Sequence, residues 1–222
     1  YIIATSLGNG RRVVFGDEPY RNVPISLAVA ASSAVPVIYN PIRIGNDDYI
    51  DGGLRGNASL DVAIEKGAKL VVCVNPLVPF DNTSDILDNS VEFLSDQGMQ
   101  VVIDQMLRIV LHSGLHYHVK QLRRQHPDVD IILIEPNHSD RRMMFANIMR
   151  YSTRLAIAQH GYESVTSELA QDYFYFKATL ARHGVDISRR NVVPRLQQLR
   201  EAGQNRQMVA DVLDVPGRPM QP

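Results

Sequence analysis

The sequence predicts an α/β fold, and three observations carry this prediction. Residues 69–74 (KLVVCV) and 129–134 (VDIILI) are continuous apolar runs, which is typical of strands buried on both faces of a parallel sheet. A helical pattern over residues 60–66 ends at Gly67, directly before the first run. A short strand at residues 49–50 precedes that helix. Strand, helix and buried strand in this order indicate helices layered on a mostly parallel sheet.

The other elements are predicted from turn residues and apolar spacing. Up to residue 48 they are a hairpin over 1–6 and 12–15 with a glycine-rich turn, a buried helix over 24–34, an extended segment over 37–44 and a turn over 46–48. Later elements are a loop over 81–89, helices over 91–124 (broken near Gly98 or Gly114), 141–170 (interrupted at Gly161), 172–183, 194–201 and 207–213, and a disordered tail over 215–222.

Composition sets the size of the core and limits the partners. The chain has 222 residues, 45% of them hydrophobic, which fits one large domain or a domain and a half. A net charge of −1 provides no basic field, so no nucleic-acid partner is expected. Residues 112–222 hold 15 basic and 11 acidic side chains, against 8 and 13 in residues 1–111. This asymmetry fits either ordinary surface variation or a weakly basic face in peripheral contact with a membrane.

Two further features concern the cysteine and the chain start. The single cysteine, Cys73, lies in an apolar run, which predicts a buried structural thiol. No apolar run approaches the roughly 18–20 residues of a membrane-spanning helix. Because the chain begins with Tyr1 inside a predicted strand, we expect it to be part of a longer polypeptide.

The segment YIDGG places an acid where α/β proteins often carry chemistry. Asp51 directly follows a predicted strand and precedes Gly52 and Gly53. A carboxylate at a strand end is a common position for a catalytic group, and glycines let other backbone or a ligand come close. The alternative interpretation is that Asp-Gly is only a turn signal.

The sequence around this acid resembles one known family. Two overlapping segments carry the resemblance: ISLAVAASSAVPVIYNPIRIGNDDYIDGG and DGGLRGNASLDVAIEKGAKLVVCVNP. They are similar to the acid-bearing region of the patatin-like phospholipases, over residues 1–80 specifically and more weakly to about residue 170. The matching positions are Ala4-Thr5, residues 31–36, Asp51–Gly53, Asn57 and residues 67–74. One departure is that family members often carry proline near Ser59.

The resemblance implies a fold and an activity. The implied fold is a three-layer α/β/α arrangement with a mostly parallel central sheet, whose N-terminal strands are missing from this chain. The implied activity is hydrolysis of lipid acyl esters by a Ser–Asp dyad, with Asp51 as the general base. Gly52, Gly53 and Asn57 would shape the turn and the following helix start. The family's mechanism implies no metal and no cofactor.

The nucleophile is not found in these residues. The family carries its serine in a G-x-S-x-G segment, and no such segment occurs in the 222 residues. The nearest piece, Ala4–Gly8, lacks the first glycine and lies on the predicted hairpin. Ser32 and Ser33 lie on the Ala-rich helix, and Ser113 lacks an acid and a nucleophile turn. We therefore expect an upstream segment to supply the serine, and this chain alone to be inactive.

Three histidines allow a second interpretation. His112 and His116 are four residues apart, so one helix face can present both, with His118 nearby. Metal sites use this spacing, but no carboxylate or cysteine ligand is evident beside them, and a polar helix face is the simpler interpretation.

The sequence thus leads to one main hypothesis and two rivals. Residues 1–185 are predicted to form the C-terminal part of a patatin-like hydrolase domain, and residues 186–222 a polar, partly disordered extension. The predicted partners are a lipid or acyl-ester substrate and the upstream segment. The rivals are a non-catalytic binding or regulatory subunit that keeps half of a hydrolase fold, and an unrelated α/β domain in which DGG is a structural turn.

Overall fold

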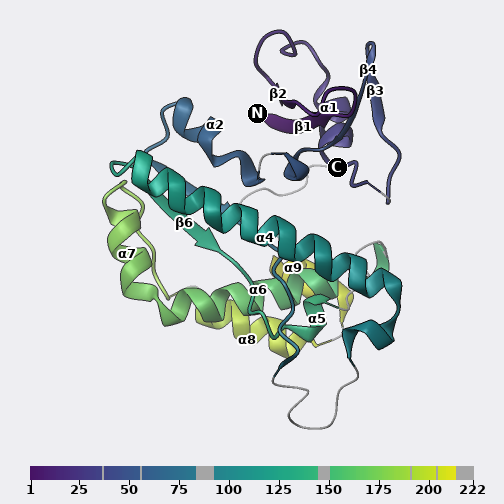
Figure 1. Cartoon of the computed structure of the whole chain (residues 1–222). Coiled ribbons are helices and arrows are strands. Elements are labelled where there is room, and N and C mark those ends of the chain that lie inside the picture. Colours follow the sequence, from purple (N-terminus) through teal and green to yellow (C-terminus); the bar gives the residue numbers. More distant parts are fainter. Residues whose placement is uncertain are drawn as a thin grey trace, which may run out of the picture. The chain divides into compact units, whose positions relative to one another are not determined.

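The structure is a computed structural model that describes residues 1–36, 38–55, 57–83, 93–144, 151–190, 192–203 and 205–213. The chain divides into two compact units. Figure 1 shows the chain coloured along its sequence. The first unit contains residues 1–77 and 103–133, and the second contains residues 78–102 and 134–222. In the part of the chain that the structure describes, every helix is too short or too polar to cross a bilayer.

The first unit contains a four-stranded antiparallel sheet. Its strands are β1 (Ile2–Ser6), β2 (Arg12–Phe15), β3 (Ile42–Ile44) and β4 (Asp47–Asp51), in the order β2-β1-β4-β3. The β1–β2 hairpin confirms the predicted one, with Ala4 opposite Val13. Gly10 takes a φ of 67°, which favours glycine over residues with a Cβ.

Helix α1 (Ile25–Ser32) packs on one face of this sheet. Its contact side consists of Ala28 and Ala31, whose small side chains allow the helix to approach the strands closely. The buried cluster beneath it consists of Ala4, Val13, Phe15, Ala28, Ala31 and Tyr49. The Ala-rich run therefore forms a helix as predicted, but only one side of it is buried, since Ile25, Leu27 and Val29 are exposed.

The β3–β4 hairpin corrects two predictions. The turn lies at Gly45 and Asn46, so Asp47 and Asp48 are strand residues and not turn residues. Gly45 takes a φ of 63°, which makes it the residue that reverses the chain. The strand before the turn is shorter than the extended segment predicted over 37–44, and Val37 lies outside the described residues.

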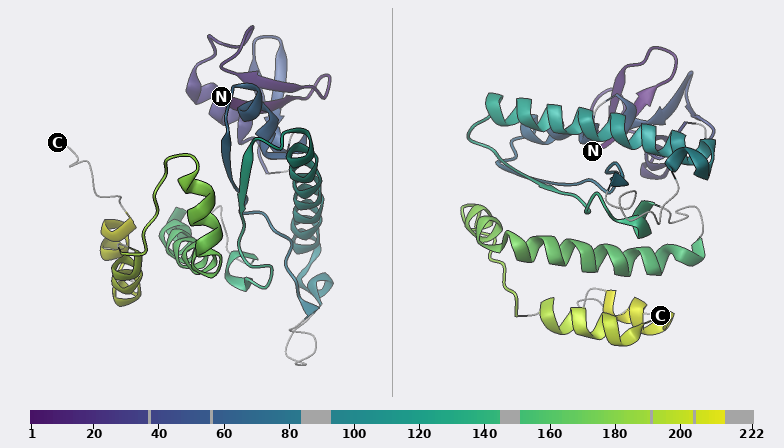
Figure 2. Two further views of the ribbon diagram at one scale, coloured as in Figure 1. Left: turned by 90° about the vertical axis from the view of Figure 1, so that its left-hand side faces the viewer. Right: turned by 60° about the horizontal axis from the view of Figure 1, so that its bottom comes forward.

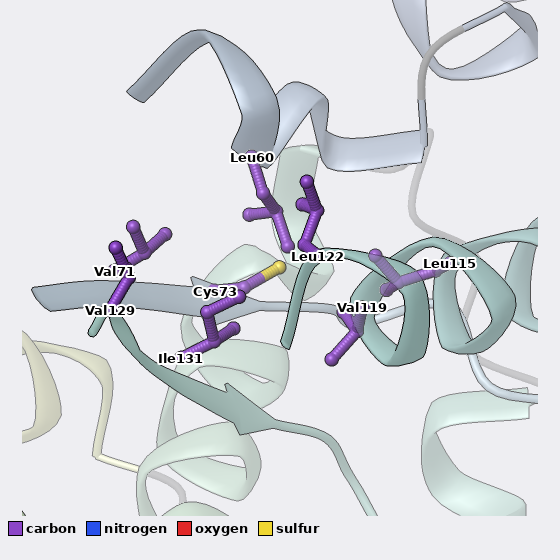
Figure 3. Close-up of a cluster of buried hydrophobic side chains, with 8 residues drawn as sticks. All are labelled: Leu60, Val71, Cys73, Leu115, Val119, Leu122, Val129 and Ile131. Carbon is purple, nitrogen blue, oxygen red and sulfur yellow. The ribbon is translucent and has the colours of Figure 1, made fainter. Parts of the chain in front are cut away.

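The first unit also contains α2 (Leu60–Glu65), β5 (Leu70–Val74) and most of α4 (Met99–Gln125) and β6 (Asp130–Ile134). Figure 3 shows the apolar side chains that converge from these elements. Leu60 comes from α2, Val71 and Cys73 from β5, and Leu115, Val119, Leu122, Val129 and Ile131 from α4, β6 and the turn before β6. Cys73 is buried in this cluster, as predicted.

Strand β5 is buried on one face only, contrary to the prediction. Its burial alternates, so Val71 and Cys73 face the core while Val72 and Val74 are exposed. Strands β5 and β6 form a separate two-stranded sheet. The fold is therefore mixed α/β with small sheets, and the three-layer arrangement around a parallel sheet stays a prediction.

The second unit is mainly helical. Besides α5 (Arg141–Met144), it contains α6 (Arg154–Gln171), α7 (Tyr173–Ala181), α8 (Val192–Ala202) and α9 (Arg206–Leu213). Figure 2 shows α8 running beside α6, and Leu199, Ala202 and Val209 form their shared core with α9. Helices α8 and α9 confirm the two short helices predicted near the C-terminus.

Two predicted helix breaks have different outcomes. Gly98 separates the 3₁₀ turn Leu94–Gln97 from α4, with a φ of 99°, whereas α4 continues through Gly114. Helix α6 also continues through Gly161, so the predicted interruption there is wrong. Parts of the predicted 81–89 loop and 141–170 helix, and the predicted disordered tail, lie outside the described residues. The predicted boundary at residue 185 stays a prediction.

Candidate functional site

Asp51 is the last residue of β4, at the end of the strand where the sequence predicted it. It lies opposite Ala4 of β1, and its backbone N–H donates to the carbonyl oxygen of Ala34 at 3.0 Å. Cross-strand pairs share a face of the sheet, so Asp51 lies on the same face as Ala4 and α1. The side chain is half-buried. The position is thus fixed by the neighbouring strand and by the segment that follows α1.

The side chain of Asp51 organises the turn that follows it. Its Oδ1 accepts a hydrogen bond of 2.7 Å from the backbone N–H of Gly53. This caps the 3₁₀ turn Gly52–Leu54 and satisfies one of its unpaired donors. Among the described residues, Oδ2 of Asp51 accepts no hydrogen bond. Oδ1 of Asp51 therefore holds the turn.

Gly52 is required because the backbone of β1 leaves no room for a side chain. A Cβ at this position would lie 2.4 Å from the carbonyl oxygen of Ile3 and 2.7 Å from its carbonyl carbon. Gly52 does not have the positive φ that favours glycine. The sequence predicted that the two glycines let other backbone or a ligand come close. For Gly52 the close neighbour is the first strand of the chain itself.

The segment after the turn has an unusual backbone. Asn57 begins the 3₁₀ turn Asn57–Ser59, in which Ala58 and Ser59 have φ values of 55° and 45°. Ser59 stands at the N-cap position of α2 without a side-chain cap hydrogen bond. The sequence offers Asn57 or Ser59 as the N-cap of this helix, and Ser59 does not cap it with its side chain. The side chain of Asn57 lies outside the described residues, so its predicted role stays a prediction.

A serine and an aspartate are hydrogen-bonded to each other at the opposite end of the β1–β4 strand pair from Asp51. Ser6 of β1 donates a hydrogen bond of 2.5 Å to Oδ2 of Asp47, the first residue of β4. Ser6 is only 1% exposed, so its hydroxyl cannot meet a substrate. The pair closes the β1–β4 ladder, and the antiparallel register, not sequence spacing, brings the two residues together.

The other serines considered from the sequence occupy positions that fit structure better than catalysis. Ser32 ends α1 and Ser33 is its C-cap residue, and Ser113 lies on the exposed side of α4. In the described part of the chain, none of these three serines is hydrogen-bonded to Asp51.

The histidines of α4 divide into a pair and a single residue. The rings of His112 and His116 lie 4.2 Å apart between centroids, so one helix face presents both as predicted. His118 instead lies 3.7 Å from Asp61 of α2, which also binds Arg12 at 2.6 Å. His118 therefore belongs to the contact between α2, α4 and the sheet.

One cluster in the second unit was not anticipated from the sequence. Nε2 of His160 on α6 lies 2.6 Å from Oδ2 of Asp140, whose Oδ1 accepts from the backbone N–H of Met143. His160 also lines a pocket of about 450 Å³ together with Arg142, Ser152, Leu155, Ala156, Gln159, Glu163, Gly203 and Val209. Twenty residues separate Asp140 from His160 in the chain, and no periodic pattern links positions on different helices. The pair joins the start of α5 to α6.

Residues 2–64 match the model of the patatin-like phospholipase family. This match confirms the resemblance seen in the sequence, and it contains the whole sheet, the Asp51 turn and most of α2. "Probable lipid hydrolase 463L" of Invertebrate iridescent virus 6 is 30% identical over 64 residues. That alignment covers 29% of this chain and 22% of the relative, so the two share about a fifth of the relative's length. Both comparisons associate part of this chain with lipid hydrolases.

Proposed function

We propose that this chain supplies the acid-bearing part of a lipid acyl hydrolase of the phospholipase A or lysophospholipase type. The observation that carries the proposal is the position of Asp51. It ends a central strand, its turn is fixed by backbone contacts, and it lies within the segment that matches the patatin-like phospholipases.

In this proposal Asp51 is the general base of a Ser–Asp dyad. Oδ2 would accept the proton of the serine hydroxyl as the serine oxygen attacks the ester carbonyl. An aspartate has an ordinary pKa of about 3.9 and is a weak base for an alcohol. Most of the rate enhancement would therefore come from orientation and from donors that stabilise the oxyanion. The hydrogen bond between Oδ1 and Gly53 would provide that orientation by fixing the carboxylate plane.

The serine would come from a segment outside the 222 residues, because these contain no G-x-S-x-G sequence. In the longer polypeptide we expect a three-layer α/β/α fold around a mostly parallel sheet. The uncovered apolar face of β5, with Val72 and Val74, supports this expectation because further structure would bury it.

The proposal is tested with the longer polypeptide that contains this chain, by labelling with a fluorophosphonate and by hydrolysis of a soluble acyl ester. We expect Asp51→Asn to reduce hydrolysis at least about 100-fold while the turn persists, since an amide oxygen can still accept from Gly53. The matched control is Asp48→Asn on the opposite face of the same strand, where the carboxylate pairs with exposed Arg43. This control is expected to retain activity.

Two outcomes contradict the proposal. Full activity of Asp51→Asn would show that Asp51 is not the base. No labelling and no hydrolysis by the unchanged polypeptide, across several acyl esters, would favour the rival hypothesis of a non-catalytic binding or regulatory subunit.

A further inference from the structure

The aromatic segment YFYF at the start of α7 is divided between the inside and the outside of the second unit. Phe176 is buried and, with Thr179, forms the inner side of the helix. Phe174 is 82% exposed and Tyr175 is 55% exposed. Packing inside the second unit therefore accounts for only part of this aromatic segment.

The start of α7, which carries the exposed aromatic pair, is held by side-chain contacts. Tyr173 donates from its hydroxyl to the carbonyl oxygen of Ile187 at 3.1 Å, and the guanidinium of Arg189 lies 4.2 Å from the centre of its ring. Arg189 also donates to the carbonyl oxygen of Ala170 at 2.9 Å. These contacts hold the segment after α7 against the start of α7. Figure 2 shows α7 at the end of α6. The exposure of Phe174 therefore belongs to a fixed helix and not to a frayed end.

Basic side chains lie close in sequence to the exposed aromatic pair. Lys177 follows Phe174 by three residues and is exposed on α7, and Arg190 is exposed in the segment that folds back. Residues 172–190 contain four Lys and Arg side chains against two Asp side chains. Aromatic side chains flanked by cations are typical of helices that lie in the headgroup region of a bilayer.

The size of the patch favours a lipid surface over a protein partner. Each aromatic side chain can bury about 150–250 Å², so Phe174 and Tyr175 together provide roughly 300–500 Å². A stable protein interface needs about 800 Å² from each partner. Insertion of two aromatic side chains between headgroups needs no such area, and the nearby cations add attraction to anionic lipids.

We propose that α7 docks the second unit on an anionic lipid surface, with Phe174 and Tyr175 inserted and Lys177 and Arg190 at the headgroups. The inference deepens the proposed lipid hydrolase function, on which its biological meaning rests, because it names the surface that would bring the protein to its substrate. The binding itself can be measured whether or not the chain hydrolyses esters.

The first experiment uses the absence of tryptophan from the chain. In Phe174→Trp the new side chain is the only indole, so its fluorescence reports on this position alone. With vesicles containing phosphatidylserine and phosphatidylcholine, we expect a blue shift and quenching by brominated acyl chains. Tyr117→Trp is the matched control, because Tyr117 is a 71% exposed aromatic residue on α4. A tryptophan at position 174 that stays in water on these vesicles overturns the proposal.

The second experiment removes the patch and measures co-sedimentation with the same vesicles. Replacing Phe174 and Tyr175 with serine is expected to weaken binding about tenfold or more, whereas Tyr117→Ser leaves it unchanged. Lys177→Gln with Arg190→Gln is expected to weaken binding about fivefold per charge, with loss of its salt dependence. Equal binding by the Phe174 and Tyr175 variant, or equal loss in the Tyr117 control, contradicts the proposal.

The two proposals fail in different ways. If Asp51 is not a catalytic base, Asp51→Asn retains hydrolysis while Phe174→Trp still inserts. If α7 is not a docking surface, vesicle binding is insensitive to Phe174 and Tyr175 while hydrolysis of a soluble ester still depends on Asp51. Binding equally to vesicles of pure phosphatidylcholine would overturn the assignment to anionic lipid.

Discussion

The Asp51 turn and helix α7 hold the side chains of the two proposals in opposite ways. Asp51 is held by backbone contacts between segments about 50 residues apart, including its pairing with Ala4 and the approach of Gly52 to Ile3. Helix α7 is held by side chains, chiefly Tyr173 and Phe176, and leaves Phe174 outside. The close backbone contact at Gly52 leaves no room for a larger side chain, whereas the exposed position of Phe174 accepts different side chains. The segment that matches the family model ends at residue 64, so the Asp51 turn lies inside the matched region and α7 lies outside it.

The largest expected effect is that of Gly52→Ala. The new Cβ would lie 2.4 Å from the carbonyl oxygen of Ile3, so β1 and the turn must separate. Overpacking against backbone typically costs 1–3 kcal/mol and occasionally more, and we expect about 3 kcal/mol of lost stability. Urea unfolding followed by circular dichroism measures this change. A loss below about 1 kcal/mol would mean that the turn is not fixed by the backbone of β1.

The next effect concerns pH and the core beneath α1. Burial of Tyr49, together with a hydrogen bond to Tyr20, raises the pKa of Tyr49 to about 12. The folded state therefore favours the protonated phenol. The resulting stability is complete below the ordinary pKa of about 10 and is lost as pH rises through about 12.

We expect this loss to amount to roughly 2–3 kcal/mol, and to be absent in Tyr49→Phe. The measurement is urea unfolding of both proteins at about pH 9 and about pH 11.5. Parallel pH dependence of the two proteins would show that Tyr49 does not account for the loss.

Ser6→Ala distinguishes the buried Ser–Asp pair from the proposed catalytic acid. Removing the Ser6 hydroxyl leaves Asp47 without its 2.5 Å donor, and hydrogen bonds to charged groups contribute about 1.5–3 kcal/mol. Because Asp47 is partly accessible, we expect a loss of about 1–2 kcal/mol. In the longer polypeptide the ester hydrolysis per folded molecule should be unchanged. Abolished hydrolysis with unchanged stability would instead identify Ser6 as a nucleophile.

The smallest effect is expected from Gly161→Ala on α6. A Cβ there meets no atom within 4 Å, and the helix is continuous through this position. Alanine should stabilise the second unit by about 0.5–1 kcal/mol because glycine is a poor helix former. Thermal unfolding measures this gain. A destabilised Gly161→Ala would contradict the continuous α6 and restore the interruption predicted from the sequence.

Local sequence signals predicted many of the elements. The glycine-rich turn predicted the β1–β2 hairpin, the Ala-rich run predicted α1, and Gly98 correctly marked a helix boundary. Such features succeed because they depend on the preferences of a few adjacent residues. Gly161 misled for the same reason, since a single glycine inside a helix is tolerated at modest cost.

The sequence by itself determined that an acid follows a strand and precedes a glycine turn, and the resemblance indicated lipid hydrolysis. Only the tertiary structure decided why Gly52 must be glycine, since Ile3 is 49 residues away and its carbonyl position depends on strand pairing. It also decided that Ser6 is paired with Asp47, that β5 is open on one face, and that Phe174 and Phe176 face opposite ways. These features depend on contacts between residues that are far apart in the sequence, and such contacts exist only once the chain has folded.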